Sequence, residues 1–429
     1  MLYGVRIPIL MVFIFLSILQ FSWVGGAFAQ AGIDSKKRDL KNVYELAWDR
    51  QPEAKSFQYR VEAAQAKQKI ASSLLANPAY LELAQKTDRT NSNQGVSETI
   101  AGLGFPLWLW GERSSSIGLA DAEYKKLLSQ YYVIQLKIAA EVRDIFWGFQ
   151  KAQVELVLAN TRYENAATLA KDVSKRFVAG DLSRADVHQA EGAMSFAEAI
   201  LAEAKANAIG ATQKMSSLTG SKGQQVDARK ANSFSLKPEP IPKVPQSFSD
   251  LDASQPVVVA LLDQLEVAKK ALELAKAQTR STPELQLLTT RGREVYGVPY
   301  QQSITLGIKF PFGSDARNTS RVATSTADKV EAESLLNFER ERILFSIDSA
   351  VGQVEASKVK LDAANKRSKL ASETRGFFEK SFRFGETDLP TRLRIELEAV
   401  EANRQAALAQ IDHSVAISNL RQALGLLPE

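Results

Sequence analysis

The chain has 429 residues, of which 45% are hydrophobic and 24% charged, with no cysteine and a formal net charge of +5 at pH 7. The absence of cysteine excludes disulfides and thiolate metal sites, and a weak positive charge dispersed over the chain gives no reason to expect nucleic acid binding. After residue 30 the sequence contains no run of 18 apolar residues, so no membrane-spanning helix is predicted there.

Residues 1–29 have the pattern of a signal peptide. Arg6 precedes the apolar run Ile7–Phe21, and Ala27-Phe28-Ala29 has the small-x-small form of a cleavage site. This pattern predicts an exported protein whose mature chain starts near Gln30. The alternative interpretation is an N-terminal membrane anchor.

Residues 30–220 are predicted to form a first repeat. A helix over 40–75, interrupted at Gln51-Pro52, precedes a β-hairpin at about 79–107, and a long helix follows over 114–176. The long helix carries a seven-residue apolar repeat, which is typical of helices that wrap around partner helices. The members of this seam are Ile138, Val142, Ile145, Phe149, Ala152, Leu156, Ala159, Tyr163, Ala166, Ala170 and Val173.

A turn over residues 176–183, called the first tip below, joins the long helix to a return helix that ends at Gly220. Gly180 is predicted to be left-handed, and either Asp181 or Ser183 is expected to cap the return helix. Residues 221–256 contain five prolines, which predicts an extended linker between two halves.

Residues 257–429 repeat the first half at a constant offset of 205. Landmark pairs at this offset are Pro78 and Pro283, Phe105-Pro106 and Phe310-Pro311, Gly180 and Gly385, and Gly220 and Gly425. The second repeat is therefore predicted to contain a helix, a β-hairpin at about 284–312 and a second long helical hairpin. Only Arg375 is foreign to the repeated seam. The turn over residues 381–388 is called the second tip.

The last strand of each hairpin alternates between apolar and polar residues, which predicts one lipid-facing side and one water-facing side. The predicted lipid-facing residues are Leu103, Phe105, Leu107, Ile304, Leu306, Ile308, Phe310 and Phe312. The first strand of each hairpin is less regular. Leu81 and Leu83 fall on one face of the first strand, whereas Leu285 and Leu287, aligned by the 205-residue offset, fall on the opposite face. Hairpins on a water-soluble sheet are the alternative.

Two hairpins supply only four strands, whereas single-chain bacterial barrels begin at about eight. Unpaired strand edges are not tolerated in lipid, so the strands are expected to close with copies from other chains. Seams lined by Ala and Ser likewise favour a ring of helices around a hollow centre. A coiled-coil rod would also have such seams, but it would not need the hairpins.

The sequence resembles the TolC-type outer-membrane efflux channel family over essentially all of the mature chain. The resemblance is carried by the duplicated plan, by the run Gly-Phe-Pro-Leu-Trp-Leu-Trp-Gly-Glu-Arg at 104–113, and by the two tips. It implies a mainly α protein with a β-barrel part: a homotrimer with twelve strands in the lipid of the outer membrane and a helical barrel in the periplasm. It also implies docking on a periplasmic adaptor (membrane fusion) protein and an inner-membrane pump. Within this family the chain resembles the heavy-metal cation efflux branch.

No catalytic, cofactor-binding or metal-binding constellation is found, so no enzyme activity is predicted. The two histidines, His188 and His413, are far apart in sequence, and the methionines of the mature chain, Met194 and Met215, lie on the return-helix seam. His413 falls on a seam position, where a structural imidazole is favoured over a ligand.

The two tips are the candidate functional sites, predicted to dock the adaptor and to gate a pore. Their candidate residues are Arg176, Phe177, Gly180, Asp181, Ser183, Arg383, Gly385, Glu386 and Asp388. The second tip has Ser381 where the first has Arg176. The alternative for each of these residues is an ordinary turn or cap. For the whole chain, the alternative to a passive export duct is a periplasmic coiled-coil adaptor or scaffold protein, and the cargo remains open among metals, drugs and proteins.

Overall fold

The computed structural model describes residues 39–220, 238–244, 254–313 and 315–429. All of them fall in one compact unit, Asp39–Glu429. The predicted signal peptide at 1–29 and most of the predicted linker at 221–256 lie outside the described residues.

The first repeat contains four helices and two strands, and its predicted first helix is divided in two because Pro52 starts a new helix. The elements are α1 (Leu40–Trp48), α2 (Pro52–Ala71), β1 (Tyr80–Thr87), β2 (Ser97–Pro106), α3 (Glu112–Val178) and α4 (Arg184–Thr219). With 67 residues, α3 is roughly 100 Å long at ~1.5 Å per residue. A helix of that length needs partners along its whole seam.

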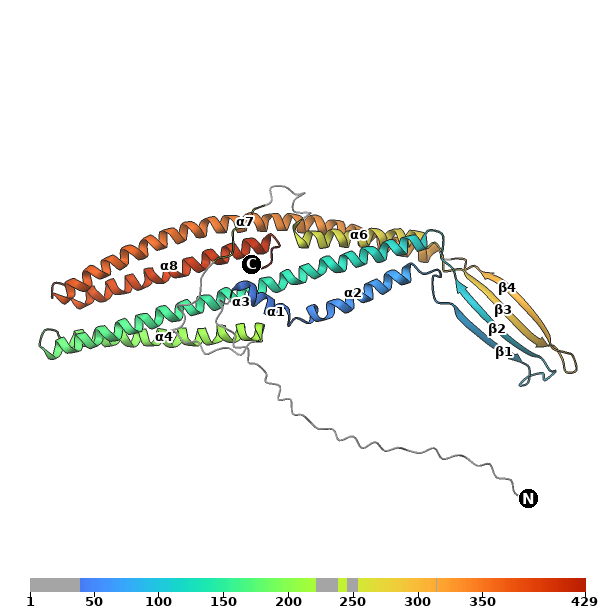
Figure 1. Cartoon of the computed structure of the whole chain (residues 1–429), viewed down its shortest axis with the longest axis horizontal. Helices are drawn as coiled ribbons and strands as arrows, with labels where there is room; N and C mark the ends of the chain where they lie inside the picture. The colour runs from blue at the N-terminus through green and yellow to red at the C-terminus, as the bar shows by residue number, and fades with distance from the viewer. Residues whose placement is uncertain (1–38, 221–237, 245–253, 314) are drawn as a thin grey trace, which may run out of the picture. The chain divides into compact units, whose positions relative to one another are not determined.

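The second repeat follows the same order. Its elements are α6 (Pro256–Ala277), β3 (Glu284–Arg293), β4 (Gln301–Lys309), α7 (Asp315–Arg383) and α8 (Leu389–Ala423). The strands lie at one end of the long helices, and the turns between α3 and α4 and between α7 and α8 lie at the other end (Figure 1). The predicted mainly α fold with a β part is confirmed. No helix among the described residues has the length and apolarity needed to cross a bilayer.

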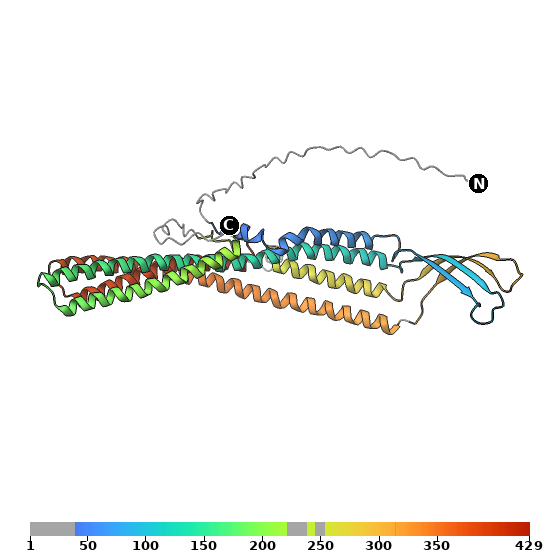
Figure 2. The same ribbon diagram turned by 90° about the horizontal axis from the view of Figure 1, so that it is seen from below.

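The two hairpins join into one antiparallel sheet with the strand order β1-β2-β3-β4, and the two repeats meet where β2 pairs with β3. Figure 1 shows the four strands side by side, and Figure 2 shows the same sheet turned by 90°. Residues directly opposite each other in an antiparallel ladder share a face. One such row, Leu81, Leu103, Leu287 and Leu306, crosses all four strands.

This row corrects the parity expected for β3 from the 205-residue offset. Leu285 pairs with Phe105 and Ile308, and Leu287 pairs with Leu103 and Leu306. Both leucines therefore lie on the same face as the apolar residues of β2 and β4. The offset misled because a shift of one residue in register moves every side chain to the opposite face, and only pairing with neighbours fixes the register.

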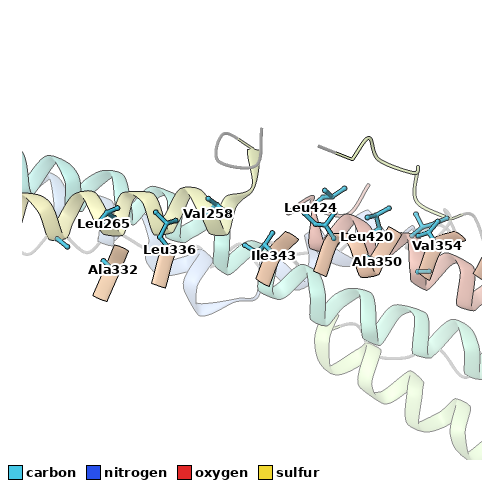
Figure 3. Packing of buried hydrophobic residues seen from close by; sticks show 13 residues of the cluster. Val258, Leu265, Ala332, Leu336, Ile343, Ala350, Val354, Leu420 and Leu424 are labelled. Atoms are coloured by element: carbon cyan, nitrogen blue, oxygen red, sulfur yellow. The ribbon is translucent and has the colours of Figure 1, made fainter. Parts of the chain in front are cut away.

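In the second repeat, the long helix α7 is covered by two shorter helices that follow one another along its seam. Figure 3 shows Val258 and Leu265 of α6 beside α7, and Leu420 and Leu424 of α8 further along it. The end of α8 meets the start of α6 closely: Gly425 has a φ of +76°, and a β-carbon there would lie 2.3 Å from Cδ of Pro256. A glycine is thus required at this join.

The seam of α3 is buried at most of its predicted positions, including Val142, Leu156 and Val173. In α7 the foreign residue Arg375 is accommodated by an ion pair, with Nη1 3.4 Å from Oε1 of Glu396 on α8. A charged seam position is therefore satisfied across the helical hairpin.

Candidate functional site

The first tip is closed by a complete Schellman motif. Gly180 has a φ of +85°, its N–H donates to the carbonyl of Phe177 (3.0 Å), and the N–H of Asp181 donates to the carbonyl of Arg176 (2.9 Å). These two bonds satisfy carbonyls that the end of α3 leaves without helical partners. Of the two predicted caps, Ser183 is the one used: it forms a capping box with Asp186 at the start of α4.

The second tip has the same motif. Gly385 has a φ of +79°, and the N–H groups of Gly385 and Glu386 donate to the carbonyls of Phe382 (3.1 Å) and Ser381 (3.0 Å). Asp388 caps α8 by accepting a hydrogen bond from the N–H of Thr391 (3.3 Å). The two turns are therefore alike in backbone.

Arg176 connects the two tips. Its Nη1 donates to the carbonyl of Phe382 (3.1 Å) and its Nη2 to the carbonyl of Arg383 (3.0 Å), while its guanidinium lies 5.1 Å from the centre of the Phe382 ring. Both carbonyls belong to the last turn of α7, where the helix dipole favours a cation. One predicted residue of the first tip thus holds the end of the second long helix.

A small apolar cluster underlies this contact and draws on all four long helices. Its buried members are Leu169, Ala170 and Val173 of α3, Ala190 of α4, Phe382 of α7 and Leu389 of α8. Sequence reasoning missed Phe382 and Leu389 as core residues. Phe177 and Phe384 are not part of this cluster and are 40% and 82% exposed. The predicted residues Gly180, Asp181, Gly385 and Glu386 are also exposed.

Above this cluster, a groove of about 790 Å³ runs between the two helical hairpins. Its charged lining residues are six cations, Arg162, Lys175, Arg176, Arg375, Arg383 and Arg392, and three anions, Asp172, Glu379 and Glu396. The hydrogen bond from Arg383 to Glu379 (2.9 Å) lowers the pKa of that carboxyl below its ordinary value. The groove therefore has an excess of positive charge at neutral pH.

A second connection between the repeats, here called the buried junction, consists of Arg143, Glu239, Ser418 and Arg421. Nη2 of Arg143 and Nε of Arg421 lie 3.0 Å and 3.1 Å from Oε1 of Glu239, and Ser418 donates to Oε2 at 2.5 Å. The Arg421 Nε contact is an ion pair without aligned hydrogen-bond geometry. All four residues are at most 5% exposed.

Sequence reasoning did not identify this junction. Glu239 belongs to the linker between the repeats, Arg143 to α3 and Arg421 to α8. The only available signal was a glutamate between Pro238 and Pro240, and that does not name its partners.

Five of the predicted lipid-facing residues, Leu103, Phe105, Ile304, Leu306 and Ile308, share one face of the sheet, called the apolar face, and Leu107, Phe310 and Phe312 follow just after the ends of β2 and β4. On β4 and just after it, Ile304, Leu306 and Phe312 are 75%, 71% and 86% exposed. Ile308 and Phe310 are also exposed, Leu103 is 43% exposed, and Phe105 and Leu107 are half-buried. Among the described residues, strands β1 and β4 each pair on one side only, so both edges of the sheet are open there.

The histidines lie apart from these features. His188 is exposed, with Nδ1 4.0 Å from Glu191, and His413 Nδ1 lies 2.9 Å from the hydroxyl of Ser357, which is also a seam residue. The part of the chain that the structure describes contains no group of three or more His, Cys, Asp or Glu residues that could hold a metal ion.

Comparison with known proteins gives consistent matches. Residues 43–221 match the family described as outer membrane efflux protein. The cobalt-zinc-cadmium resistance protein CzcC of Cupriavidus metallidurans is 25% identical over 290 residues, which is 67% of each chain.

Solved structures show the same fold at low sequence identity. The CusC structures, which concern conformational changes accompanying folding and transmembrane channel formation, align with a TM-score of 0.75 and 14% identity. The alignment covers 91% of this chain and 93% of CusC. A membrane protein from Pseudomonas aeruginosa aligns with a TM-score of 0.71 and 17% identity, over 90% of this chain and 94% of that protein. The outer membrane protein VceC of Vibrio cholerae aligns with a TM-score of 0.68 and 17% identity, over 91% of this chain and 97% of VceC.

Proposed function

We propose that this chain works as a passive homotrimeric duct for metal cations. It belongs to the outer membrane efflux protein family and is the outer-membrane channel component of an efflux system. In this proposal the sheet lies in the outer membrane and the long helices extend into the periplasm. A periplasmic adaptor and an inner-membrane pump supply the cargo, and the duct itself catalyses no reaction.

The observation that carries the homotrimer is the pair of open sheet edges next to an exposed apolar face. A four-stranded sheet cannot remain in lipid with β1 and β4 unpaired. Pairing β4 of one copy with β1 of the next satisfies both edges, and three copies would supply twelve strands. Even-numbered antiparallel barrels of this size lie within the known range.

The choice of metal cations as cargo is supported by the name of the CzcC relative, a cobalt-zinc-cadmium resistance protein. In our proposal the cations pass in water and are selected by the pump. A strain that lacks the gene should become sensitive to cobalt, zinc or cadmium, while its sensitivity to drugs and detergents stays unchanged. The opposite pattern would assign the duct to another cargo.

We further propose that the two tips form the periplasmic entrance, where they dock the adaptor and gate the pore. Arg176, Asp181, Arg383, Glu386 and Asp388 supply charge at this end of the helices. The exposed aromatic ring of Phe177 and the charged groove beside the tips also support a contact surface.

The test replaces Gly180 and Gly385 with valine. A β-carbon at either position meets no neighbouring atom within 4 Å, so the main effect of the change is on the left-handed backbone, at a cost of roughly 1–2 kcal/mol or more per site. The turns should be reshaped and metal export lost, while trimers still form.

Gly192→Val is the matched control, because Gly192 lies within α4 with open space around its Cα and no positive φ. Export by this variant should be close to wild type. Normal export by the Gly180→Val/Gly385→Val variant would show that the tips do not gate the pore.

A further inference from the structure

The apolar face of the sheet changes composition from row to row toward the loops that join the strands. Three rows are mainly apolar: Phe105-Leu285-Ile308, Leu81-Leu103-Leu287-Leu306 and Leu83-Ala101-Thr289-Ile304. The next two rows on the same face are polar and cationic: Gln85-Thr99-Arg291-Gln302 and Thr87-Ser97-Arg293. The face thus has a sharp boundary between Thr289 and Arg291.

The apolar stretch is comparable in length with the apolar band of an outer-membrane barrel. It runs from Ile304 on β4 to Phe312, just after the strand. If the chain is extended throughout, this stretch covers roughly 27 Å at ~3.4 Å per residue, which is roughly 20 Å along the membrane normal at the ~35–45° tilt of barrel strands, against a band of ~25 Å. An arginine on the lipid side is costly at the midplane of a bilayer and nearly neutral at its surface. Arg291 and Arg293 therefore fit the level of the lipid headgroups, at the end of the sheet away from the helices.

Both guanidinium groups are held over tyrosine rings. Arg291 lies 5.3 Å from the ring centre of Tyr300, and Arg293 lies 5.0 Å from Tyr300 and 5.2 Å from Tyr296. A cation stacked on an aromatic ring uses its planar face, so its N–H edge remains available for an anion. Within the described residues, neither arginine forms a salt bridge with a carboxylate.

The loops fix this cluster in place. Nε of Arg293 donates to the carbonyl of Gly95 (3.1 Å), the N–H of Tyr296 donates to the carbonyl of Gln94 (3.0 Å), and the Tyr296 hydroxyl donates to Oδ1 of Asn93 (3.0 Å). A β-carbon on Gly95 would come within 2.8 Å of the Tyr296 ring, so the glycine leaves room for it. Arg293 and Tyr296 are thus anchored to the neighbouring loop, and Tyr300 and Arg291 join them through the ring contacts.

We propose that Arg291 and Arg293, framed by Tyr296 and Tyr300, bind the phosphate groups of a membrane lipid in the leaflet next to these loops. The site rests on the proposed placement of the sheet in the outer membrane. Arginine binds phosphate through two parallel N–H bonds, and tyrosines beside it suit the headgroup region. The occupant is a phosphorylated lipid because the cations adjoin the apolar face, where acyl chains would lie.

The test uses purified full-length protein and two lipids that differ only in phosphate: diphosphoryl lipid A and its dephosphorylated form. Native mass spectrometry measures how much lipid each protein retains, and planar bilayers measure conductance. Wild-type protein should prefer the phosphorylated lipid. The variant Arg291→Gln/Arg293→Gln should lose about tenfold or more of this binding while it still conducts.

Two further variants make the result specific. Arg291→Gln alone keeps the bond from Arg293 to Gly95 and should lose part of the binding without disturbing the loops. Lys86→Gln removes a cation near the same level on the opposite face of the sheet, where Lys86 lies 3.8 Å from Glu98, and it should bind lipid as wild type does.

Equal retention of both lipids by conducting wild-type protein, or equal losses in the Lys86 and arginine variants, would overturn the lipid site and leave the duct intact. Wild-type protein that fails to insert and conduct would instead overturn the proposed function and the lipid site together.

Discussion

The two repeats are connected by arginines of α3 at two levels, and the two connections differ in burial. At the buried junction Arg143 is 2% exposed and shares Glu239 with Arg421, and it also donates to the side chain of Gln422 (2.6 Å) and the carbonyl of Leu426 (3.1 Å). At the tips Arg176 is only partly buried and binds two backbone carbonyls of α7. The same residue type therefore makes a fully enclosed contact at one level and a solvent-accessible one at the other.

This difference indicates where the two helical hairpins can separate. Breaking a buried charge cluster leaves charges without partners in a medium of low dielectric constant, whereas carbonyls released at an exposed helix end can bind water. Local opening therefore costs less at the tips than at the junction. We expect the junction to stay closed while the tips move.

The largest expected effect comes from Glu239→Ala. Loss of the carboxylate leaves Arg143 buried without an anion and leaves Arg421 with only the exposed Glu429 at 3.2 Å, which should lower the free energy of unfolding by about 3–5 kcal/mol. Thermal unfolding of the purified protein, followed by circular dichroism, measures the loss.

Asp412→Ala is the matched control on α8. Asp412 pairs with Lys360 at 2.7 Å, but both side chains are well exposed, so this change should cost less than about 1 kcal/mol. Equal destabilisation by the two variants would contradict the distinction between buried and exposed contacts.

An intermediate effect is expected for Arg176→Ala. Two charge-assisted hydrogen bonds to α7 are lost; such bonds contribute roughly 1.5–3 kcal/mol each when buried and less at this partly exposed site, so the total should stay below that of Glu239→Ala. Amide hydrogen exchange should accelerate over residues 169–190 and 378–393, with little change at the junction.

Ser381→Ala is a control that perturbs the second tip alone. Ser381 holds only its own turn, through a 2.6 Å hydrogen bond with the hydroxyl of Thr387. Faster exchange should then be confined to the second tip. Spread of the effect to α3 would show that the tips are coupled by more than Arg176.

The smallest effect is that of acid on the tips. Hydrogen bonds from Arg383 and from Ser183 lower the pKa values of Glu379 and Asp186 below their ordinary values of 4.5 and 3.8. A carboxyl whose pKa is lower in the folded state than in the unfolded state stabilises the fold at every pH above its unfolded-state pKa. This stabilisation is lost as the pH falls through the folded-state pKa. The protection factor at the tips, which corrects the exchange rate for its intrinsic dependence on pH, should thus be constant from neutrality down to about 4.5 and fall below it. Glu379→Gln should reduce that fall, and a fall that begins near neutral pH would point to other groups.

The helices and the second strand of each hairpin could be predicted because their signals are local and periodic. Val142, Leu156 and Val173 are buried as the seven-residue repeat requires. The glycines of both tips have positive φ, as their place after a long seam predicts. The side of the sheet to which Leu285 and Leu287 belong could not be obtained, because it depends on pairing with β2 and β4.

The partners of charged residues were equally out of reach from sequence. Arg176 was identified as a tip residue, but its acceptors are backbone carbonyls, which every residue has. Arg375 was identified as foreign to the seam without a sign that Glu396 would balance it. Glu239, in a proline-rich segment, gave no indication that it would lie between two arginines.

The buried junction also has a consequence for biogenesis. Arg143 and Gln422 are 279 positions apart in the chain, and Arg143 and Glu239 are 96 apart. The contact that holds the two repeats therefore cannot form in a nascent first half, and closing such long loops slows folding. Until the second half has been synthesised, Arg143 must stay hydrated or be shielded by a chaperone, and the unfinished polypeptide is vulnerable to proteases and aggregation.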